Sequence, residues 1–423
     1  MQKLTYKIYT LGCKVNQYDS GSLAVKLSAA GFIMKKNNAD LAVINTCAVT
    51  KTALRKDRQM IVRARRENPR AKIAIVGCAV KIYKEEVEKW GGDFVLTGSD
   101  LDKFIKIQST NYKAQTKHKT QSTNCQSIFL EPKIKKSRYF LKVQDGCRQF
   151  CSYCIVPYAR GELKSRSLAE VLAEAQIVAE AGIKEIVLCG IHLGLYGQEI
   201  KNKKLKIKNN LTALLKELIK IKNLSRIRLS SIEVNEVTDE LIELMKKERK
   251  LCRQLHIPLQ SGCDKILKLM NRPYTTKIFE EKIKKIRKAL PDIAITTDVI
   301  VGFPGETEKD FRATMSFIKK TNFSKLHVFP FSAHERTPAA RMLGQIDDAV
   351  KNIRVKKLNE LSRSLEKTYT ERFINKSLKV IIDGRSQGRS LRGKTEYNFD
   401  IRFVSEKKYN QGEVAQVKNW ELL

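Results

Sequence analysis

The sequence predicts an α/β protein of two or three domains, and three observations support this fold class. The chain has 423 residues, 42% of them apolar, which is enough to bury more than one core. Short strand-like runs alternate with amphipathic helix-like runs over most of its length, an order typical of parallel sheets. Near the carboxyl end the apolar residues recur at every second position, a period that predicts antiparallel strands.

Residues 1–115 make up the first predicted domain, a parallel sheet of the flavodoxin-like type. Strand-like and helix-like runs alternate there, with the first helix ended by Gly31 and the second near Pro69. Residues 116–136 are rich in Thr, Ser, Gln, Asn and Lys and have no apolar period, so we expect a connector. The expected elements are strands at 6–11, 41–45 and 72–76 and helices at 20–30 and 53–67.

Residues 137–365 predict a partial barrel of six β/α units. Amphipathic helices separate the strand-like runs, and one of these helices opens with a capping box from Ser167 to Glu170. In barrels of this kind the active face is formed by the carboxyl ends of the strands. The six expected strands cover 140–143, 185–189, 225–229, 254–257, 293–300 and 325–329.

Residues 366–423 predict a small antiparallel β-barrel. In one run Leu378, Val380 and Ile382 alternate with more polar residues, although Ile381 breaks the polar side. A second run alternates in the same way from 397 to 403, and glycines between the runs supply the turns. We therefore expect the last part of the chain to differ in architecture from the parallel domains before it.

The net charge indicates a polyanionic partner. Lysine and arginine exceed aspartate and glutamate by 36, a surplus that attracts RNA or DNA. Much of the surplus is lysine in a chain that is also rich in asparagine and isoleucine, so coding bias on a solvated surface is an alternative explanation. Composition alone leaves both interpretations open.

Several function classes have no support in the sequence. No stretch approaches 18 uncharged apolar residues, and residues 1–12 lack a secretory pattern, so we expect a cytoplasmic protein with no membrane partner. No Ser-His-Asp arrangement, phosphate-binding loop or metal-protease helix occurs, which disfavours hydrolysis and nucleotide-driven work. In a reducing compartment the ten cysteines are not expected to form a disulfide framework. Their spacing must therefore indicate the chemistry.

Three cysteines lie close together in residues 145–154, directly after an expected strand. We call Cys147, Cys151 and Cys154 the loop trio. Three thiolates can hold three irons of a 4Fe–4S cluster and leave the fourth iron open to an external ligand. A structural zinc site would need a fourth ligand nearby, and a thioredoxin-like pair would leave Cys147 unexplained. The spacing therefore favours an iron–sulfur cluster.

Three further cysteines each follow the carboxyl end of an expected strand in the first domain. We call Cys13, Cys47 and Cys78 the strand-end trio. Ligands of open parallel sheets gather at that edge, so the three thiols could converge on one cluster. Because free cysteine is commonly buried as a small apolar residue, structural cysteines are the alternative.

The segments around both trios resemble known families. Residues 145–154 resemble the signature of radical S-adenosylmethionine enzymes, in which that cofactor chelates the open iron and is cleaved to a deoxyadenosyl radical. Segments 10–17, 45–50 and 76–78 resemble the amino-terminal domain of methylthiotransferases, which carries a second 4Fe–4S cluster. The resemblance thus implies two 4Fe–4S clusters, with S-adenosylmethionine as both methyl donor and radical source.

The resemblance also implies residues that line the cofactor. Tyr153 resembles the aromatic residue that flanks the adenine, and glycine at Gly190 would let the backbone approach an amino-acid group. Polar side chains at strand ends could bind the ribose or the methionine amine, although loop capping would also explain them. The expected cofactor-binding residues are Tyr153, Gly190, Ser231, Glu233, Gln260, Asp298 and Gly302.

The carboxyl-terminal barrel resembles the small RNA-binding TRAM domain. We expect the basic residues in its turns to contact backbone phosphates without reading bases, with solvated surface charge as the alternative. The expected RNA-binding residues are Arg385, Arg389, Arg392 and Lys394. The expected substrate portion is the anticodon stem-loop of tRNA.

Within the methylthiotransferases, the quoted segments resemble most the enzymes that act on threonylcarbamoyladenosine at tRNA position 37. The implied reaction replaces the hydrogen on carbon 2 of the adenine by a methylthio group, with electrons from a flavodoxin- or ferredoxin-type reductant, in a monomeric protein. Alternatives of the same class are methylthiolation of isopentenyladenosine or of a ribosomal-protein aspartate. An alternative of another class is a non-catalytic RNA-binding iron–sulfur electron carrier.

Overall fold

The computed structural model describes residues 4–115, 137–198, 210–385 and 389–423. The chain divides into two compact units, one from Met1–Lys135 with Ile155–Gly161 and the other from Lys136–Cys154 with Glu162–Leu423. Within the described ranges, no helix has the length and apolar character needed to cross a bilayer. The predicted boundaries at 115, 136 and 365 stay predictions, and a single helix, α14 (Asp348–Glu371), runs across the last of them.

The first unit is built on one parallel sheet. Its strand order is β2-β1-β3-β4-β5, which is the order of the flavodoxin-like type. The central strands pair in register, with Ile8 opposite Val43 and Val43 opposite Ala74. The strands are β1 (Thr5–Thr10), β2 (Ile33–Met34), β3 (Leu41–Thr46), β4 (Lys72–Gly77) and β5 (Phe94–Val95).

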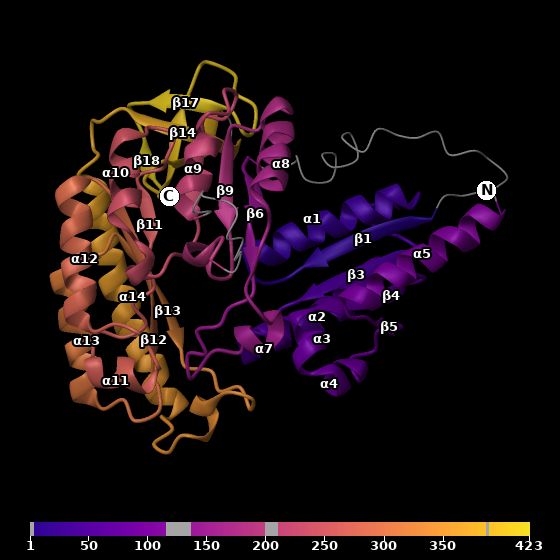
Figure 1. The fold of residues 1–423 in the computed structure, drawn as a ribbon, viewed down its shortest axis with the longest axis horizontal. Coiled ribbons are helices and arrows are strands. Elements are labelled where there is room, and N and C mark those ends of the chain that lie inside the picture. Colours follow the sequence, from indigo (N-terminus) through magenta and orange to yellow (C-terminus); the bar gives the residue numbers. More distant parts are fainter. Residues whose placement is uncertain (1–3, 116–136, 199–209, 386–388) are drawn as a thin grey trace, which may run out of the picture. The chain divides into compact units, whose positions relative to one another are not determined.

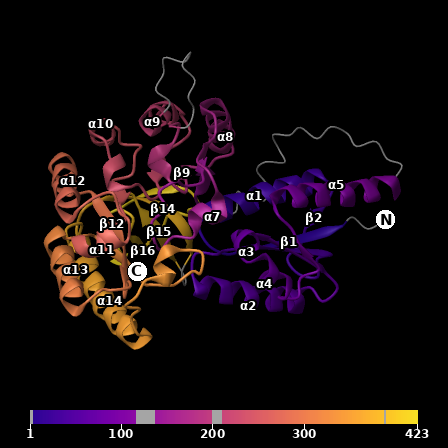
Figure 2. The ribbon, with the colours of Figure 1, turned by 60° about the horizontal axis from the view of Figure 1, so that its bottom comes forward.

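Helices cover both faces of this sheet (Figure 2). One face packs against α1 (Lys14–Ala29) and α5 (Gly98–Gln115), which contribute Leu27 and Ile105 to the buried core. The other face packs against α2 (Lys51–Glu67), α3 (Cys78–Ile82) and α4 (Lys84–Glu88). Because both faces are covered, the central strands β3 and β4 are mainly apolar, and every residue of β3 is buried, including Asn45 and Thr46.

A short helix, α7 (Val156–Arg160), belongs to the first unit although it follows the loop trio in sequence. Its Ala159, with the preceding Ile155, packs against Ala48 and Ile82. The loop trio and this helix are therefore consecutive in the chain but belong to different units.

The second unit contains the six predicted barrel strands, all parallel. They form two hydrogen-bonded groups, β10-β9-β6 and β11-β12-β13. Bridges from Ile227 to Leu251 and from Ser231 to His256 join the groups, so the strands follow one another in chain order. The strands are β6 (Tyr139–Lys142), β9 (Glu185–Cys189), β10 (Arg226–Leu229), β11 (Gln254–His256), β12 (Ala294–Val301) and β13 (Lys325–Pro330). The prediction of a partial (β/α)6 barrel is confirmed.

Helices connect these strands, as the amphipathic runs predicted (Figure 1). The capping box from Ser167 to Glu170 opens α8, with the serine side chain and the glutamate side chain each paired to the other's backbone. The helices are α8 (Leu168–Glu180), α9 (Leu211–Ile219), α10 (Asp239–Lys247), α11 (Asp264–Leu269), α12 (Thr276–Ala289), α13 (Glu308–Thr321) and α14, with 3-10 turns at η1 (Leu193–Leu195), η2 (Val234–Glu236) and η3 (Pro338–Arg341). A two-stranded antiparallel pair joins β7 (Gln144–Asp145) to β8 (Lys164–Ser165).

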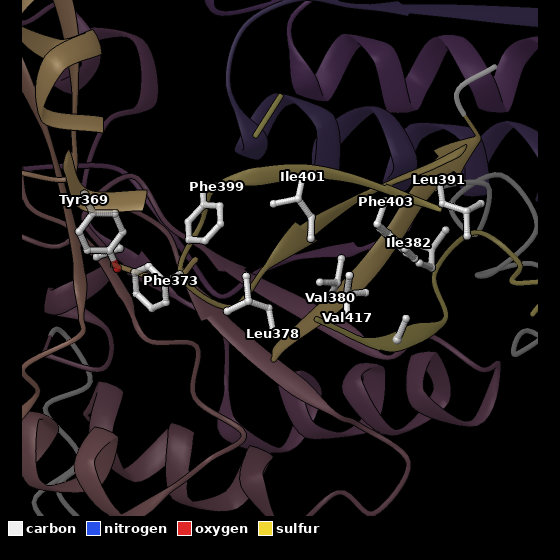
Figure 3. Close-up of a cluster of buried hydrophobic side chains, with 12 residues drawn as sticks. Tyr369, Phe373, Leu378, Val380, Ile382, Leu391, Phe399, Ile401, Phe403 and Val417 are labelled. Carbon is white, nitrogen blue, oxygen red and sulfur yellow. The ribbon is translucent and has the colours of Figure 1, made fainter. Parts of the chain in front are cut away.

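The carboxyl-terminal strands form an antiparallel sheet in the order β17-β14-β15-β16-β18. Its apolar side chains pack with Tyr369 and Phe373 into one core, which Figure 3 shows. The run that Ile381 breaks is explained by burial, because this side chain is also fully buried on β14. The strands are β14 (Leu378–Arg385), β15 (Ser390–Thr395), β16 (Asp400–Val404), β17 (Val414–Val417) and β18 (Glu421–Leu422). The predicted change to antiparallel structure is confirmed.

A buried ion network joins this sheet to the barrel strands of the same unit. The carboxylate of Glu185 pairs with Arg226 at 2.5 Å and with Arg228 at 2.9 Å, and the two arginines hold its pKa low despite its burial. Their guanidinium groups donate onward to the carbonyl oxygens of Lys379, at 2.9 Å, and of Thr395, at 2.9 Å. Every charge in this network therefore has a partner.

Candidate cluster and cofactor sites

The strand-end trio lies at the carboxyl edge of the first sheet, as predicted. Cys13 follows β1, Cys47 follows β3, and Cys78 is the first residue of α3 after β4. The backbone at Gly12 has a φ of +93°, and a β-carbon there would lie 2.9 Å from the Cys47 sulfur. Glycine is thus required for the chain carrying Cys13 to pass beside Cys47.

Buried polar side chains hold this edge together. Asn16 donates to the carbonyl oxygens of Leu11, at 2.8 Å, and Thr46, at 2.9 Å, which ties the ends of β1 and β3. Its own side-chain oxygen accepts from Arg160, whose guanidinium also pairs with Asp19 at 2.7 Å. Asn16 therefore fixes the helix that begins beside Cys13.

The electrostatic surroundings of the strand-end trio are set by burial. Burial raises the pKa of Cys47 to about 12, and the nearby thiols of Cys78 and Cys13 add to the shift. Burial also raises the pKa of Cys78, with Arg160 opposing it. The Asp57 carboxylate accepts from the backbone nitrogen of Cys47 at 3.1 Å. Since a metal takes the thiolate form, binding here must displace protons.

The loop trio is anchored to the segment after α11. The backbone nitrogen of Ser152 donates to Met270 at 3.1 Å, and its hydroxyl donates to Leu269 at 2.7 Å. Asn271 donates to the carbonyl oxygen of Phe150 at 3.1 Å, where the backbone has a φ of +43°. These bonds hold the turn that brings Cys151 toward the interior, where it is buried.

Two cationic side chains contact the loop trio. The Nδ1 atom of His192 lies 3.4 Å from the sulfur of Cys147, and the Nη1 atom of Arg272 donates to the sulfur of Cys151 at 3.1 Å. Each cation is held by a carboxylate on its other side, His192 by Glu236 and Arg272 by Glu233. Both glutamates lie in the turn after β10, so one short segment orients both thiol partners.

The charges of these partners follow from their contacts. Burial opposes a charge on His192, but hydrogen bonds to Cys147 and Glu236 outweigh it and raise its pKa to about 10. Burial also opposes the charge of Arg272, and Tyr153, Tyr274 and Glu233 raise its pKa above the ordinary range. Both side chains therefore act as hydrogen-bond donors toward sulfur.

The predicted cofactor-binding residues lie in the second unit after successive strands. Gly190 follows β9, where a β-carbon would meet the Gln144 side chain at 2.9 Å. Ser231 follows β10 and is exposed, and the buried Gln260 follows β11 with a φ of +65°. Asp298 lies within β12, and its carboxylate lies 3.2 Å from His256 Nε2. Gly190, Ser231 and Gln260 thus follow the ends of three successive strands, whereas Asp298 lies inside β12, and the cofactor-binding role of all four stays a prediction.

The remaining cofactor predictions have packing explanations beside the functional one. Tyr153 packs at the edge of a core that includes Phe303 and Phe331. Glu233 is bound to Arg272, so its carboxylate is already engaged. Gly302 has a φ of +71°, and a β-carbon there would lie 2.3 Å from the Lys351 side chain on α14. Close packing therefore requires glycine at this position.

The predicted RNA-binding residues are only partly in turns. Arg389 is exposed and precedes β15, and Arg385 ends β14 with a side chain outside the described ones. The prediction that Arg385, Arg392 and Lys394 lie in turns is wrong, because Arg385 belongs to β14 and the other two belong to β15. Lys394 pairs with Asp400 at 2.8 Å, which leaves Arg389 and Arg392 as the more accessible cations.

Several site residues were missed by the sequence analysis. Arg272 and Glu236 lie far from the loop trio in sequence, and no spacing pattern links them to it. Gln144 accepts from the backbone nitrogen of His192 at 2.7 Å and donates to Gly146 at 2.8 Å, so it positions the loop from its base. Only His192 could be suspected from its local sequence, because it lies between Gly190 and Gly194 directly after a strand.

The donor sets fit an iron–sulfur cluster. Among the described residues, no three His, Cys, Asp or Glu side chains converge as the ligands of a single metal ion. A 4Fe–4S cluster takes one thiolate per iron, so its cysteines surround the cluster instead of meeting at one point. Three thiols in each trio match the three protein ligands of a cluster whose fourth iron binds an external group.

Comparison with known families agrees with this geometry. Residues 141–318 match the Radical SAM superfamily, and residues 5–97 match Uncharacterized protein family UPF0004. The Threonylcarbamoyladenosine tRNA methylthiotransferase MtaB of Bacillus subtilis is 42% identical over 89% of this chain and 84% of its own length. The chain belongs to the radical S-adenosylmethionine methylthiotransferase family. It is an enzyme that transfers methylthio groups, and S-adenosylmethionine and 4Fe–4S clusters are its cofactors.

Other relatives place the chain within this methylthiotransferase family. The Threonylcarbamoyladenosine tRNA methylthiotransferase MtaB of Thermotoga maritima is 37% identical over 95% of this chain and 91% of its own length. The tRNA-2-methylthio-N(6)-dimethylallyladenosine synthase of Acetivibrio thermocellus is 32% identical over 100% of this chain and 90% of its own length. Among solved structures, the radical S-adenosylmethionine methyltransferase TsrM from Kitasatospora setae shares the fold, with a TM-score of 0.57 over 80% of this chain and 77% of that one at 15% identity.

Proposed function

We propose that this enzyme converts threonylcarbamoyladenosine at tRNA position 37 into its 2-methylthio derivative. The observation that carries the proposal is the 42% identity, over 89% of the chain, to a relative named for that substrate. Relatives named for dimethylallyladenosine are 32% to 35% identical. The ordering of these identities favours the threonylcarbamoyl substrate.

The two trios would hold the two clusters. In this proposal the strand-end trio binds the auxiliary cluster and the loop trio binds the cluster that chelates S-adenosylmethionine. When bound, these groups supply a radical that removes an unactivated hydrogen from carbon 2 and a methylated sulfur that replaces it. An adenine C–H bond has no acidic proton, so a side-chain base alone could not start the reaction.

The side chains around the loop trio would fix and tune its thiolates. His192 and Arg272 donate hydrogen bonds to two of the three sulfurs, at 3.4 Å and 3.1 Å. Donors at ligand sulfurs stabilise negative charge there and raise the reduction potential of a cluster. The carboxylates of Glu233 and Glu236 keep the two donors in place, which is why we assign them an orienting role in addition to any cofactor contact.

The cofactor would lie over the carboxyl ends of the barrel strands. Tyr153, Gly190, Ser231, Gln260, Asp298 and Gly302 remain the proposed lining. Gln260, in the segment after β11, lies beside Asp298 on β12, because the Gln260 nitrogen donates to the Asp298 carbonyl oxygen at 2.9 Å. Polar groups from adjacent strands can orient a ribose and an amino-acid moiety together.

The remaining parts of the proposal concern partners. The tRNA would present its anticodon stem-loop, with exposed Arg389 and Arg392 of the carboxyl-terminal sheet contacting phosphates. A flavodoxin- or ferredoxin-type protein would supply electrons to a monomeric, cytoplasmic enzyme. Arg385 and Lys394 belong to the same proposed surface, the latter already paired to Asp400.

The test uses the anaerobically reconstituted full-length enzyme with reductant, S-adenosylmethionine and two tRNA substrates. One tRNA carries threonylcarbamoyladenosine and the other carries isopentenyladenosine, and nucleoside mass spectrometry follows the products. We expect the 2-methylthio derivative of threonylcarbamoyladenosine, with 5′-deoxyadenosine and S-adenosylhomocysteine. A methylthiolated product from the isopentenyladenosine tRNA alone would overturn the proposed substrate. If neither 5′-deoxyadenosine nor S-adenosylhomocysteine forms, the protein would instead be an electron carrier.

A further inference from the structure

Most arginines of the first unit lie on one helix, α2. The chain has 55 lysines and 26 arginines, yet the six arginines found before residue 138 all lie between positions 55 and 70. A composition that favours lysine explains a basic surface in general, but it does not explain why arginine gathers here. Arginine differs from lysine in having a planar fork that binds a phosphate through two parallel hydrogen bonds.

These arginines divide into two groups by their contacts. Three of them pair with carboxylates of the first unit, namely Arg58 with Glu86, Arg63 with Glu67 at 2.7 Å, and Arg65 with Asp93 at 3.2 Å. The others have no ion pair with any residue that the structure describes, and neither has the neighbouring Lys56. This second group consists of Arg55, Lys56, Arg66 and Arg70.

Three of these cations, Arg55, Lys56 and Arg66, are exposed on α2, and Arg70 follows the end of the helix. The opposite face is buried through Asp57, Ile61 and Ala64. Positions 55, 59, 62 and 66, which are Arg, Gln, Val and Arg, follow the helical spacing and form an exposed stripe without a carboxylate. Lys56 is exposed beside this stripe, about 100° around the helix from Arg55. At 1.5 Å per residue, the stripe from Arg55 to Arg66 extends about 16 Å, which is long enough to meet several phosphates.

The stripe begins beside the strand-end trio. The helix starts at Lys51, four positions after Cys47, and Asp57 accepts from the Cys47 backbone nitrogen at 3.1 Å. Arg55 and Lys56 therefore lie within one helical turn of the residue that contacts the cysteine edge. Nucleic acid held there would be close to the sulfur that the proposed reaction must deliver.

We propose that Arg55, Lys56 and Arg66 on α2 bind the phosphate backbone of the substrate tRNA. This inference rests on the proposed function and adds a second RNA surface, in the first unit, to the one expected on the carboxyl-terminal sheet. Phosphate contacts position a nucleic acid without reading its bases. The stripe thus contributes to the affinity for tRNA and fixes where the tRNA backbone lies on the protein. Other residues recognise the modified adenosine.

The test compares two triple variants that remove the same charge from the same helix. The stripe variant carries Arg55→Gln, Lys56→Gln and Arg66→Gln, and the control variant carries Arg58→Gln, Arg63→Gln and Arg65→Gln. Full-length reconstituted proteins are titrated with an anticodon stem-loop RNA at several salt concentrations. Circular dichroism melting shows whether each variant is folded, and 5′-deoxyadenosine formed without RNA shows whether the radical site works.

We expect the stripe variant to bind RNA at least about tenfold more weakly at low salt, with a salt slope smaller by about 2 to 3, since each phosphate contact contributes about 0.7 to 0.9. The control variant should stay within about threefold of the parent. Equal loss in both variants would mean that only net charge matters, and no loss in the stripe variant would exclude the contact; either result overturns the inference. If the parent protein binds and modifies RNA in those cases, the proposed function survives, whereas a parent that binds no RNA defeats both.

Discussion

The two cysteine trios reach similar ligand sets by different routes. The strand-end trio is assembled by topology, because Cys13, Cys47 and Cys78 come from three strand ends of one sheet. The loop trio is assembled locally, within eight consecutive residues. Their surroundings differ in the number of cations: Arg160 opposes the effect of burial on the pKa of Cys78 in the strand-end trio, whereas His192 and Arg272 both contact sulfurs of the loop trio. Burial raises the pKa of Cys47 to about 12.

This difference separates two demands on a cluster. A cluster that passes electrons to a sulfonium benefits from hydrogen-bond donors that adjust its reduction potential. A site that carries sulfur needs an accessible cluster at a defined edge, and the exposed Cys13 beside buried Cys47 provides such an edge. The comparison predicts that damage to one trio leaves the chemistry of the other intact.

The largest effects should come from removing one ligand in each trio. We expect Cys151→Ala to abolish 5′-deoxyadenosine formation, because the loop trio then has two thiolates, and to lower bound iron by about four per chain. Cys47→Ala should lower iron by the same amount and abolish methylthio transfer, yet retain 5′-deoxyadenosine. Iron analysis and product chromatography check both. Loss of deoxyadenosine in folded Cys47→Ala protein would contradict the separation of the sites.

A smaller effect is expected from the donors at the loop trio. Arg272→Gln removes the donor to Cys151 and should slow 5′-deoxyadenosine formation about 10- to 100-fold, the range typical of residues behind metal ligands. The cluster should remain, with a more negative midpoint potential in an EPR-monitored redox titration. Arg287→Gln is the matched control, because that arginine binds the carbonyl oxygens of Thr321 and Asn322. An unchanged potential in Arg272→Gln would disprove the tuning role.

The close approach at the strand-end trio gives a third test. Gly12→Ala should destabilise the metal-free protein by about 1 to 2 kcal/mol for the left-handed backbone, and by more because its β-carbon meets the Cys47 sulfur. Gly91→Ala isolates the backbone cost, since Gly91 has a φ of +82° and open space around it. Chemical denaturation of both variants measures the difference. Equal losses would show that the contact at Cys47 is unimportant.

An effect on stability of similar size is expected at Asp57. Asp57→Leu leaves the Cys47 backbone nitrogen without its acceptor and should cost about 1 to 3 kcal/mol of unfolding free energy. Asp57→Asn keeps an acceptor oxygen and should cost less. Denaturation curves of the two variants, together with their iron content, show whether this hydrogen bond holds the strand-end trio in place. Identical curves would assign the effect to packing alone.

The difference between the trios also explains what could be predicted from the sequence. Apolar periodicity located nine parallel strands to within one residue at each end, since burial leaves an apolar pattern in strands such as β3. It missed the two-residue parallel strands β2 and β5, which are too short to show a period. The positions of Cys13, Cys47 and Cys78 after strands could be read from the same pattern. The loop trio was visible because its spacing is local.

Contacts across long sequence separations could not be predicted. Arg272 and Glu233 meet only because the segments after α11 and β10 converge on the loop trio, and no spacing pattern reports this. The location of Lys394 was misjudged because glycines were taken as turns, whereas Gly393 lies inside β15 where its partner strand β14 packs closely. Both the contact between Arg272 and Glu233 and the location of Lys394 depend on tertiary packing, which residue propensities do not report.

The buried network of Glu185, Arg226 and Arg228 has a consequence for protein engineering. The arginines stand near the amino ends of their strand and donate to main-chain oxygens of the carboxyl-terminal sheet, so the two parts share one set of neutralised charges. A chimera that exchanged this sheet for that of a relative would therefore have to import a backbone with carbonyl groups at the same places. A sheet without those carbonyl groups would leave N–H donors of both buried guanidinium groups without acceptors.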